Sequence, residues 1–218
     1  MKIVVFDNCG DDAEFGVGGT IAKLVKAGHK VVFGRFNPLT KETNKGAAIL
    51  KAKEAGINIK VNTVLLRGST DKEITDFINF SAKYDIEVRF LELMKIGLAY
   101  ENNNSLFISA KEVIDKIKET EKLKPVRVSQ DSTSFNYITS SVVKIGFIAS
   151  ESMPFCGSCS RLRLTATGKL RACLMSEQGL DLKNKNRDEY HEILTSVIAM
   201  KPFQRIHHID QVMNQIGG

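Results

Sequence analysis

Short runs of β-branched and aromatic residues, each bounded by turn-forming residues, alternate with longer amphipathic segments through the first hundred residues. Each run predicts a buried strand, and the predicted strands are residues 3–6, 30–33, 57–66 and 86–91. The intervening segments carry helix-start and helix-stop signals, and the predicted helices are residues 19–28, 41–55 and 70–82. This β-α-β order predicts an α/β fold with a parallel sheet. Four strands are too few to close an eight-stranded barrel, so we expect the sheet to stay open or to be completed by another chain.

Local signals refine the helix boundaries. Gly56 is expected to end the second helix, because glycine adopts the left-handed backbone that commonly follows a helix. The segment from Thr70 to Glu73 has the pattern of a capping box. The apolar face of the helix that follows is predicted to carry Ile74, Phe77, Ile78 and Ala82.

The pattern changes after residue 94. A helix is expected to begin at Ser109, with Val113, Ile114 and Ile117 facing the core. Residues 119–142 are polar and irregular, which predicts a surface excursion or a mobile lid, and residues 142–149 predict a strand. A last helix is predicted over residues 187–200, and its apolar side carries Ile193, Leu194, Val197 and Ile198.

Composition and charge narrow the class of protein. Of 218 residues, 43% are hydrophobic and 26% charged, which is typical of a globular protein. No run is long and apolar enough to span a bilayer and the apolar start is too short for a signal peptide, so we expect a cytoplasmic protein without a membrane partner. The net charge of +6 is compatible with an anionic ligand, but no basic stripe with interleaved aromatic residues indicates nucleic-acid binding.

The cysteines are concentrated in one stretch, from Phe155 to Leu174, which holds Cys156, Cys159 and Cys173. Two thiolates separated by two residues can hold one metal centre from a single turn, and a third can join them after a hairpin whose turn ends at Gly168. Three thiolates leave a four-coordinate metal one ligand short. The stretch therefore predicts a [4Fe-4S] cluster with one open iron, and a structural zinc or unligated core thiols remain the alternatives.

Arg161 and Arg163 lie between these cysteines, two residues apart in a predicted strand. Residues at this spacing in a strand point to the same face. Guanidinium groups beside an open metal position predict an anionic substrate such as a phosphate ester. The alternative is an exposed strand edge with solvated charge.

The cysteine stretch resembles the C-terminal cluster motif of the molybdenum cofactor biosynthesis protein A family, the radical S-adenosylmethionine GTP 3',8-cyclases. Residues 60–68 and 88–94 and the closing Gly217-Gly218 resemble the same family in the same order, so the resemblance covers about residues 36–218. It implies a lyase of molybdopterin biosynthesis with its cluster on the three cysteines. It further implies that GTP contacts Lys60, Arg161 and Arg163 and that S-adenosylmethionine contacts Met94.

The loop from Asn8 to Gly19 is similar to the opening of the zinc-dependent N-acetylglucosaminyl deacetylase family, within residues 1–35. Asp11 and Asp12 match two of that family's functional positions, but Cys9 and Gly10 replace its His-Pro pair and its distant His-x-x-His pair is absent. We therefore expect a non-catalytic turn here. A metal-dependent hydrolase built on the two aspartates is the competing hypothesis, and a non-catalytic metal-stabilised fold is the third.

These resemblances predict three regions: a deacetylase-like start (residues 1–35), a partial radical-SAM-like βα sheet (residues 36–100) and a cluster and substrate region (residues 101–218). The expected fold is an incomplete radical-SAM-like (βα) barrel or open parallel sheet, followed by an Fe-S cluster hairpin and helices. A homo-oligomer or a partner chain would complete the sheet. The 218 residues contain no Cys-x3-Cys-x2-Cys motif, so the sequence looks like a chimera or rearranged fragment, and we expect no GTP cyclisation by this chain alone.

Overall fold

A computed structural model describes residues 2–7, 30–35, 44–96, 99, 103–130, 132–165, 167–207 and 209. The chain divides into two compact units, Met1–Lys60 and Val61–Gly218. The deacetylase-like loop with Cys9, Asp11 and Asp12, the predicted helix 19–28 and the terminal glycines lie outside the described residues. The predicted region boundaries at residues 35 and 100 stay predictions.

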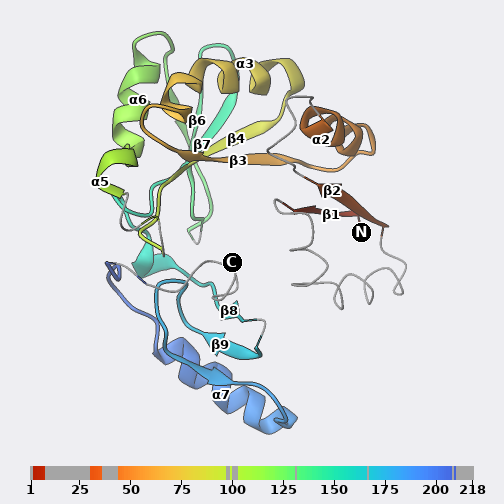
Figure 1. Ribbon diagram of the computed structural model, residues 1–218, viewed down its shortest axis with the longest axis vertical. Helices are drawn as coiled ribbons and strands as arrows, with labels where there is room; N and C mark the ends of the chain where they lie inside the picture. Colours follow the sequence, from red (N-terminus) through yellow and green to blue (C-terminus); the bar gives the residue numbers. More distant parts are fainter. Residues whose placement is uncertain are drawn as a thin grey trace. The chain divides into compact units, whose positions relative to one another are not determined.

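The first unit contains a two-stranded parallel sheet. Strand β1 (Lys2–Asp7) pairs with β2 (Lys30–Arg35) in register from Lys2 opposite Lys30 to Asp7 opposite Arg35 (Figure 1). The predicted parallel pair is therefore confirmed. Helix α2 (Asn44–Glu54) follows, and Gly56 beyond its end has a φ of 71°, which fits its predicted role as a helix stop.

A five-stranded sheet forms the main layer of the second unit, with strand order β3-β4-β7-β6-β5 (Figure 1). Its strands are β3 (Lys60–Leu65), β4 (Glu87–Glu92), β5 (Lys124–Val126), β6 (Phe135–Ile138) and β7 (Lys144–Ile148). Strands β4 and β7 are parallel, whereas β6 is antiparallel to both β5 and β7. Among the described residues β3 and β5 are the sheet edges, so this part of the chain forms an open, mixed α/β sheet.

One expectation about the second unit was wrong. The segment 119–142, expected to be irregular, contains β5 and β6. Phe135 and Tyr137 alternate with polar residues in β6 and pack against the core, but this alternation is too short to stand out in a Ser- and Lys-rich segment.

Helices α3 (Ile74–Tyr84) and α6 (Ala110–Lys118) pack against this sheet and enclose the main core (Figure 1). The rings of Phe90 on β4 and Phe147 on β7 lie at the centre of this core, 5.5 Å apart between centroids. The predicted inward residues of both helices are mostly confirmed: the buried ones are Ile74, Ile78, Val113, Ile114 and Ile117. Ala82, also expected on that face, is exposed.

The two helix starts differ from each other. Ser109 and Glu112 form a full capping box at the start of α6. The capping box predicted at Thr70 is wrong, because residues Thr70–Lys72 form a short 3-10 helix, η1, and α3 begins only at Ile74. The Thr70 hydroxyl instead accepts a hydrogen bond from the Leu66 amide at 2.6 Å, which ties it to the preceding strand end.

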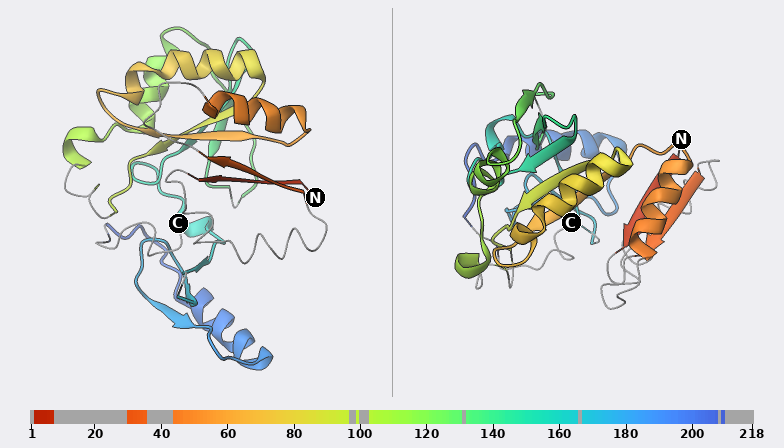
Figure 2. Two further views of the ribbon diagram at one scale, coloured as in Figure 1. Left: turned by 45° about the vertical axis from the view of Figure 1, so that its right-hand side comes forward. Right: turned by 90° about the horizontal axis from the view of Figure 1, so that it is seen from above.

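The C-terminal part of the second unit is a small antiparallel sheet with one long helix (Figure 2). It contains β8 (Arg163–Leu164), β9 (Lys169–Arg171), β10 (Gly179–Asp181) and α7 (Arg187–Ala199). A further short helix, α5 (Asn103–Leu106), lies earlier in the chain, before α6. Val197 of α7 is fully buried against Leu170 and Ala172. Leu194 and Ile198, predicted to share its buried side, are 41% and 55% exposed, so the buried stripe of α7 is narrower than expected. None of the helices in the described ranges has the length and apolar character needed to cross a membrane.

Candidate functional site

The first two cysteines lie on one tight turn. Strand β7 leads through a short loop to the 3-10 turn η2 (Cys156–Ser158), where the amide of Cys159 donates to the carbonyl of Cys156 at 3.2 Å. The backbone of Cys159 is already extended and begins the approach to β8. This turn keeps the two thiols on one short segment, as their spacing predicted.

The third cysteine returns to this turn through a hairpin. In the β8–β9 ladder, Arg163 opposes Arg171 and Leu164 opposes Leu170. Gly168 in the turn has a φ of 86°, a conformation that costs glycine little and other residues much more. The hairpin and its glycine were predicted correctly, and they place Cys173 at the end of the returning arm.

A cavity of about 270 Å³ lies between the end of the main sheet and this hairpin. Its lining includes all three cysteines together with both predicted arginines and the predicted cofactor-contacting methionine: Cys156, Cys159, Cys173, Arg161, Arg163 and Met94. Most of its remaining wall is apolar, contributed by Leu91, Ile148, Pro154, Phe155, Ala172, Leu174, Met175 and Pro202. The fold thus brings together the sulfur and guanidinium groups that the sequence singled out.

Arg161 is held against the first cysteine arm. Its Nη1 lies 3.9 Å from Sγ of Cys159, and its guanidinium carbon lies 5.5 Å from the centroid of the Phe155 ring. Contrary to the prediction, Arg161 precedes β8 and is not part of the strand, because the ladder begins only at Arg163. Both arginines nevertheless line the same cavity.

The thiols are close enough to influence one another. Burial raises the pKa of Cys156, and the neighbouring Cys173 and Cys159 raise it further, while the positive charge of Arg205 opposes this shift. Without a bound cation, the cavity therefore disfavours thiolate formation at Cys156. A metal centre would reverse this balance, because it binds the deprotonated form.

The cavity offers three thiols as its donor set. In the described part of the chain, no three His, Cys, Asp or Glu side chains converge in a way that could hold a single metal ion. In a four-iron cluster each thiolate would ligate its own iron. Three half-buried thiols around one largely apolar cavity fit such a group by their chemistry.

Two cationic residues of this cavity were missed by the sequence analysis. Lys201 donates hydrogen bonds from Nζ to the carbonyl oxygens of Arg161 and, at 3.0 Å, of Ala172. Arg205 forms an ion pair with Glu151, in which Nε lies 3.1 Å from Oε2. Both follow α7 in a segment without a recognisable motif, so nothing in the sequence connected them with the cysteines.

The sequence analysis also missed a buried carboxylate next to the loop that leads to Cys156. Glu92 ends β4 and is 1% exposed, and it accepts hydrogen bonds from the amides of Ala110, Glu151 and Ser152. In β4 it continues the alternation of Val88 and Phe90, which places it on the buried face. A charged residue at a buried strand position is the signal that was overlooked.

Two other residues, Met94 and Lys60, were predicted to contact a ligand, and only Met94 is among the residues that line the cavity. Met94 is half-buried, lines the cavity and packs in a small cluster with Ile96, Cys173 and Met175. Lys60 is exposed at the start of β3 and falls in the first unit. Its contact with GTP stays a prediction.

Comparison with known proteins places this site in a family. Residues 86–208 match the family model described as Molybdenum Cofactor Synthesis C. A GTP 3',8-cyclase of Synechocystis is 44% identical over 167 residues, which cover 77% of this chain and 51% of that protein. GTP 3',8-cyclases of Clostridium botulinum (strain Okra / Type B1) and Aquifex aeolicus are each 38% identical, over 84% and 62% of this chain and 61% and 42% of their own lengths. This chain thus spans about half the length of the relatives it matches, and the deacetylase resemblance of residues 1–35 stays a prediction. The chain belongs to the Molybdenum Cofactor Synthesis C family.

Proposed function

We propose that this chain forms the cluster- and substrate-binding part of a GTP 3',8-cyclase of molybdenum cofactor biosynthesis. In this proposal Cys156, Cys159 and Cys173 hold a [4Fe-4S] cluster, and Arg161 and Arg163 bind GTP. The observation that carries the proposal is the single cavity of about 270 Å³ lined by all five side chains. The relatives named GTP 3',8-cyclase support the identity of the substrate.

The chemistry of the cavity suits a cluster. Three thiolates and four irons leave one iron with an open position, which the bound cluster would present to a ligand atom of the purine. The protein's own contribution is a largely apolar wall, which limits the access of water, and nearby cations, which offset the negative charge of the thiolates. Arg205 is one of these cations, since its charge lowers the pKa of Cys156.

The arginines have distinct settings. Arg161 stands between the Phe155 ring and the Cys159 sulfur, so its planar guanidinium is already oriented before a ligand binds. Arg163 belongs to the β8–β9 ladder, which fixes its backbone. Guanidinium groups held in this way can bind phosphate oxygens with paired, charge-assisted hydrogen bonds.

Two further contacts are part of the proposal. Met94 lines the same cavity and would contact S-adenosylmethionine, while Lys60 would contact GTP. The 218 residues lack the Cys-x3-Cys-x2-Cys motif that the radical S-adenosylmethionine family uses to cleave that cofactor. We therefore propose that this chain does not cyclise GTP by itself and that a partner polypeptide would complete both the sheet and the chemistry.

Iron and acid-labile sulfide analysis after anaerobic reconstitution tests the cluster. About four irons and four sulfides per chain are expected, with large losses in Cys156→Ser, Cys159→Ser and Cys173→Ser and no loss in the matched control Cys9→Ser. Zinc in place of iron, or equal losses in all four variants, would contradict the assignment.

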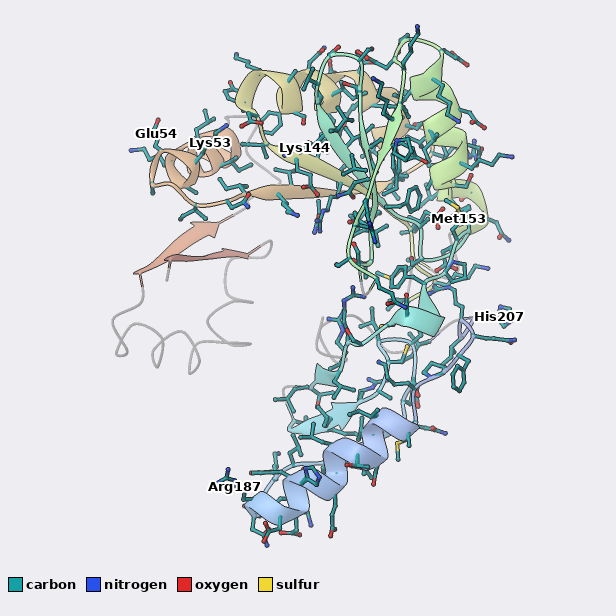
Figure 3. All side chains as sticks on the ribbon, turned by 180° about the vertical axis from the view of Figure 1, so that it is seen from behind. Lys53, Glu54, Lys144, Met153, Arg187 and His207 are labelled. Carbon is teal, nitrogen blue, oxygen red and sulfur yellow. The ribbon has the colours of Figure 1, made fainter. Side chains whose placement is uncertain are left out.

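GTP binding to the reconstituted protein tests the arginines. Calorimetry should show weaker binding for Arg161→Met and Arg163→Met, by about tenfold each, because a charge-assisted phosphate contact is lost. Arg187→Met is the matched control, since Arg187 lies exposed at the start of α7 (Figure 3). Incubation with S-adenosylmethionine, GTP and reductant should yield no 5'-deoxyadenosine from this chain alone.

A further inference from the structure

The ammonium group of Lys201 connects the two chain segments that carry the cysteines. Its Nζ donates to the carbonyl oxygen of Arg161 and, at 3.0 Å, to that of Ala172. Arg161 lies two residues after Cys159, and Ala172 immediately precedes Cys173. One side chain therefore bridges the outgoing and the returning cysteine arm.

The Lys201 bridge joins the two arms outside the paired residues of β8 and β9. The paired residues of β8 and β9 end at Arg163 opposite Arg171, on the side of the hairpin nearest the cavity. The cysteines lie further along both arms, where the β8–β9 pairing no longer fixes the distance between them. Lys201 supplies a cross-link at this position, because its ammonium can donate to both carbonyl oxygens at once.

The base of this side chain is firmly anchored. Helix α7 ends two residues before Lys201, and Val197 in its last turn is fully buried against Leu170 and Ala172. The backbone amide of Lys201 donates to the carbonyl of Ile198 at 3.1 Å. The ammonium is therefore held by a packed helix end and lines the wall of the cavity.

We propose that Lys201 is a positioning residue that sets the spacing between the Cys156–Cys159 turn and Cys173. That this spacing prepares the three thiols to bind one cluster rests on the proposed function. The positioning itself is a property of the metal-free chain. It can be measured without cluster, substrate or activity.

The test compares two disulfides in metal-free protein that also carries Cys9→Ser. The first, Cys156 to Cys173, spans the two arms and is isolated by Cys159→Ser. The second, Cys156 to Cys159, lies within one turn and is isolated by Cys173→Ser. Each forms when two thiols give two electrons and two protons to one oxidised glutathione, which becomes two reduced glutathiones. The equilibrium in a glutathione buffer gives the effective concentration of each thiol pair.

Lys201→Met should lower the effective concentration of the cross-arm pair about tenfold and change that of the within-turn pair by less than about twofold. Lys201→Arg should restore most of the cross-arm value, because a guanidinium can also donate to two carbonyls. Lys185→Met, at an exposed lysine paired with Glu189, is the matched control and should change neither value.

Three results would overturn the proposal. They are an unchanged cross-arm value in Lys201→Met, an equal fall for both pairs, and a cross-arm disulfide that does not form even with Lys201 present. The urea midpoint of each variant, followed by circular dichroism, identifies an equal fall as general loosening. If the reconstituted protein instead lacks iron while the cross-arm value still depends on Lys201, the proposed cluster fails and the positioning role stands.

Discussion

Replacing Glu92 by glutamine should weaken the connection between the main sheet and the cysteine-bearing loop. Oε1 of Glu92 accepts from the Ala110 amide at 2.8 Å and from the Ser152 hydroxyl, and Oε2 accepts from the amides of Glu151 and Ser152, both at 2.8 Å. One side chain thus links the end of β4, the start of α6 and the loop that leads to Cys156. The glutamine amide has one acceptor oxygen, so in either orientation its NH₂ group faces donors.

The magnitude follows from these contacts. In the better orientation the glutamine NH₂ group takes the place of Oε1, where it can donate to the Ser152 hydroxyl but leaves the Ala110 amide without an acceptor in a site that is 1% exposed. A buried donor without a partner costs about 1–3 kcal/mol, so we expect Glu92→Gln to lower the free energy of unfolding by about 1–3 kcal/mol. This is a substantial part of the roughly 5–15 kcal/mol typical of a domain. Glu92→Leu would remove all four acceptor contacts, and we expect it to fold poorly.

Urea unfolding of the metal-free protein, followed by circular dichroism, measures this loss. Amide hydrogen exchange should show faster exchange at Ala110, Glu151 or Ser152 in Glu92→Gln. Glu87→Gln is the matched control on the same strand, because the amide oxygen of glutamine can still accept the hydrogen bond that Nε of Arg89 donates to Glu87 at 2.6 Å. A loss below about 0.5 kcal/mol in Glu92→Gln, with the three amides still protected, would refute the reasoning.

Three other predictions concern stability. Hydrogen bonds from Arg67 and Ser109 lower the pKa of Glu112 from 4.5 to about 2. The stabilisation that the ionised Glu112 gives to the folded protein is therefore fully present above pH 4.5 and is lost as the pH falls toward 2. The free energy of unfolding should therefore depend less steeply on pH over this range in Glu112→Gln, and parallel curves would contradict the shift. Gly168→Ala should cost about 1–2 kcal/mol in urea unfolding because its φ is 86°, and an unchanged midpoint would show that the turn relaxes. Val142→Asn should gain up to about 1 kcal/mol, since Val142 is 79% exposed at a φ of 61° and asparagine tolerates this conformation, whereas a lower melting temperature would argue against backbone strain there.

The parts of the fold that could be predicted are those set by local pattern. The parallel pair β1–β2 was read from two apolar runs, and the start and inner face of α6 from Ser109 and its apolar spacing. The β8–β9 hairpin was read from its glycine turn. In each case, patterns within short segments of the sequence indicate the elements.

The errors arose where non-local contacts decide the structure. Strand β6 is only four residues long, and its place depends on pairing with β5 and β7 on either side. The sequence around Thr70 is typical of a helix cap. In the structure, however, its hydroxyl accepts from the Leu66 amide and donates to the Val64 carbonyl at the end of β3, so it does not cap α3. On α7, Leu194 and Ile198 have the right spacing for burial but stay exposed, whereas Val197 is buried against Leu170 and Ala172 and Ile193 packs beside it.

The candidate site combines both kinds of information. Cys156, Cys159 and the glycine turn are local features, and the prediction of a thiol site was based on them. The spacing of the arms depends on Lys201, and the loop before Cys156 depends on Glu92, which lies more than fifty residues earlier in the chain. A thiol motif specifies which atoms are available, but a cluster also requires fixed distances between them, and those distances come from residues that only the fold brings near. Variants at these two supporting positions should therefore impair the site while leaving every predicted ligand in place.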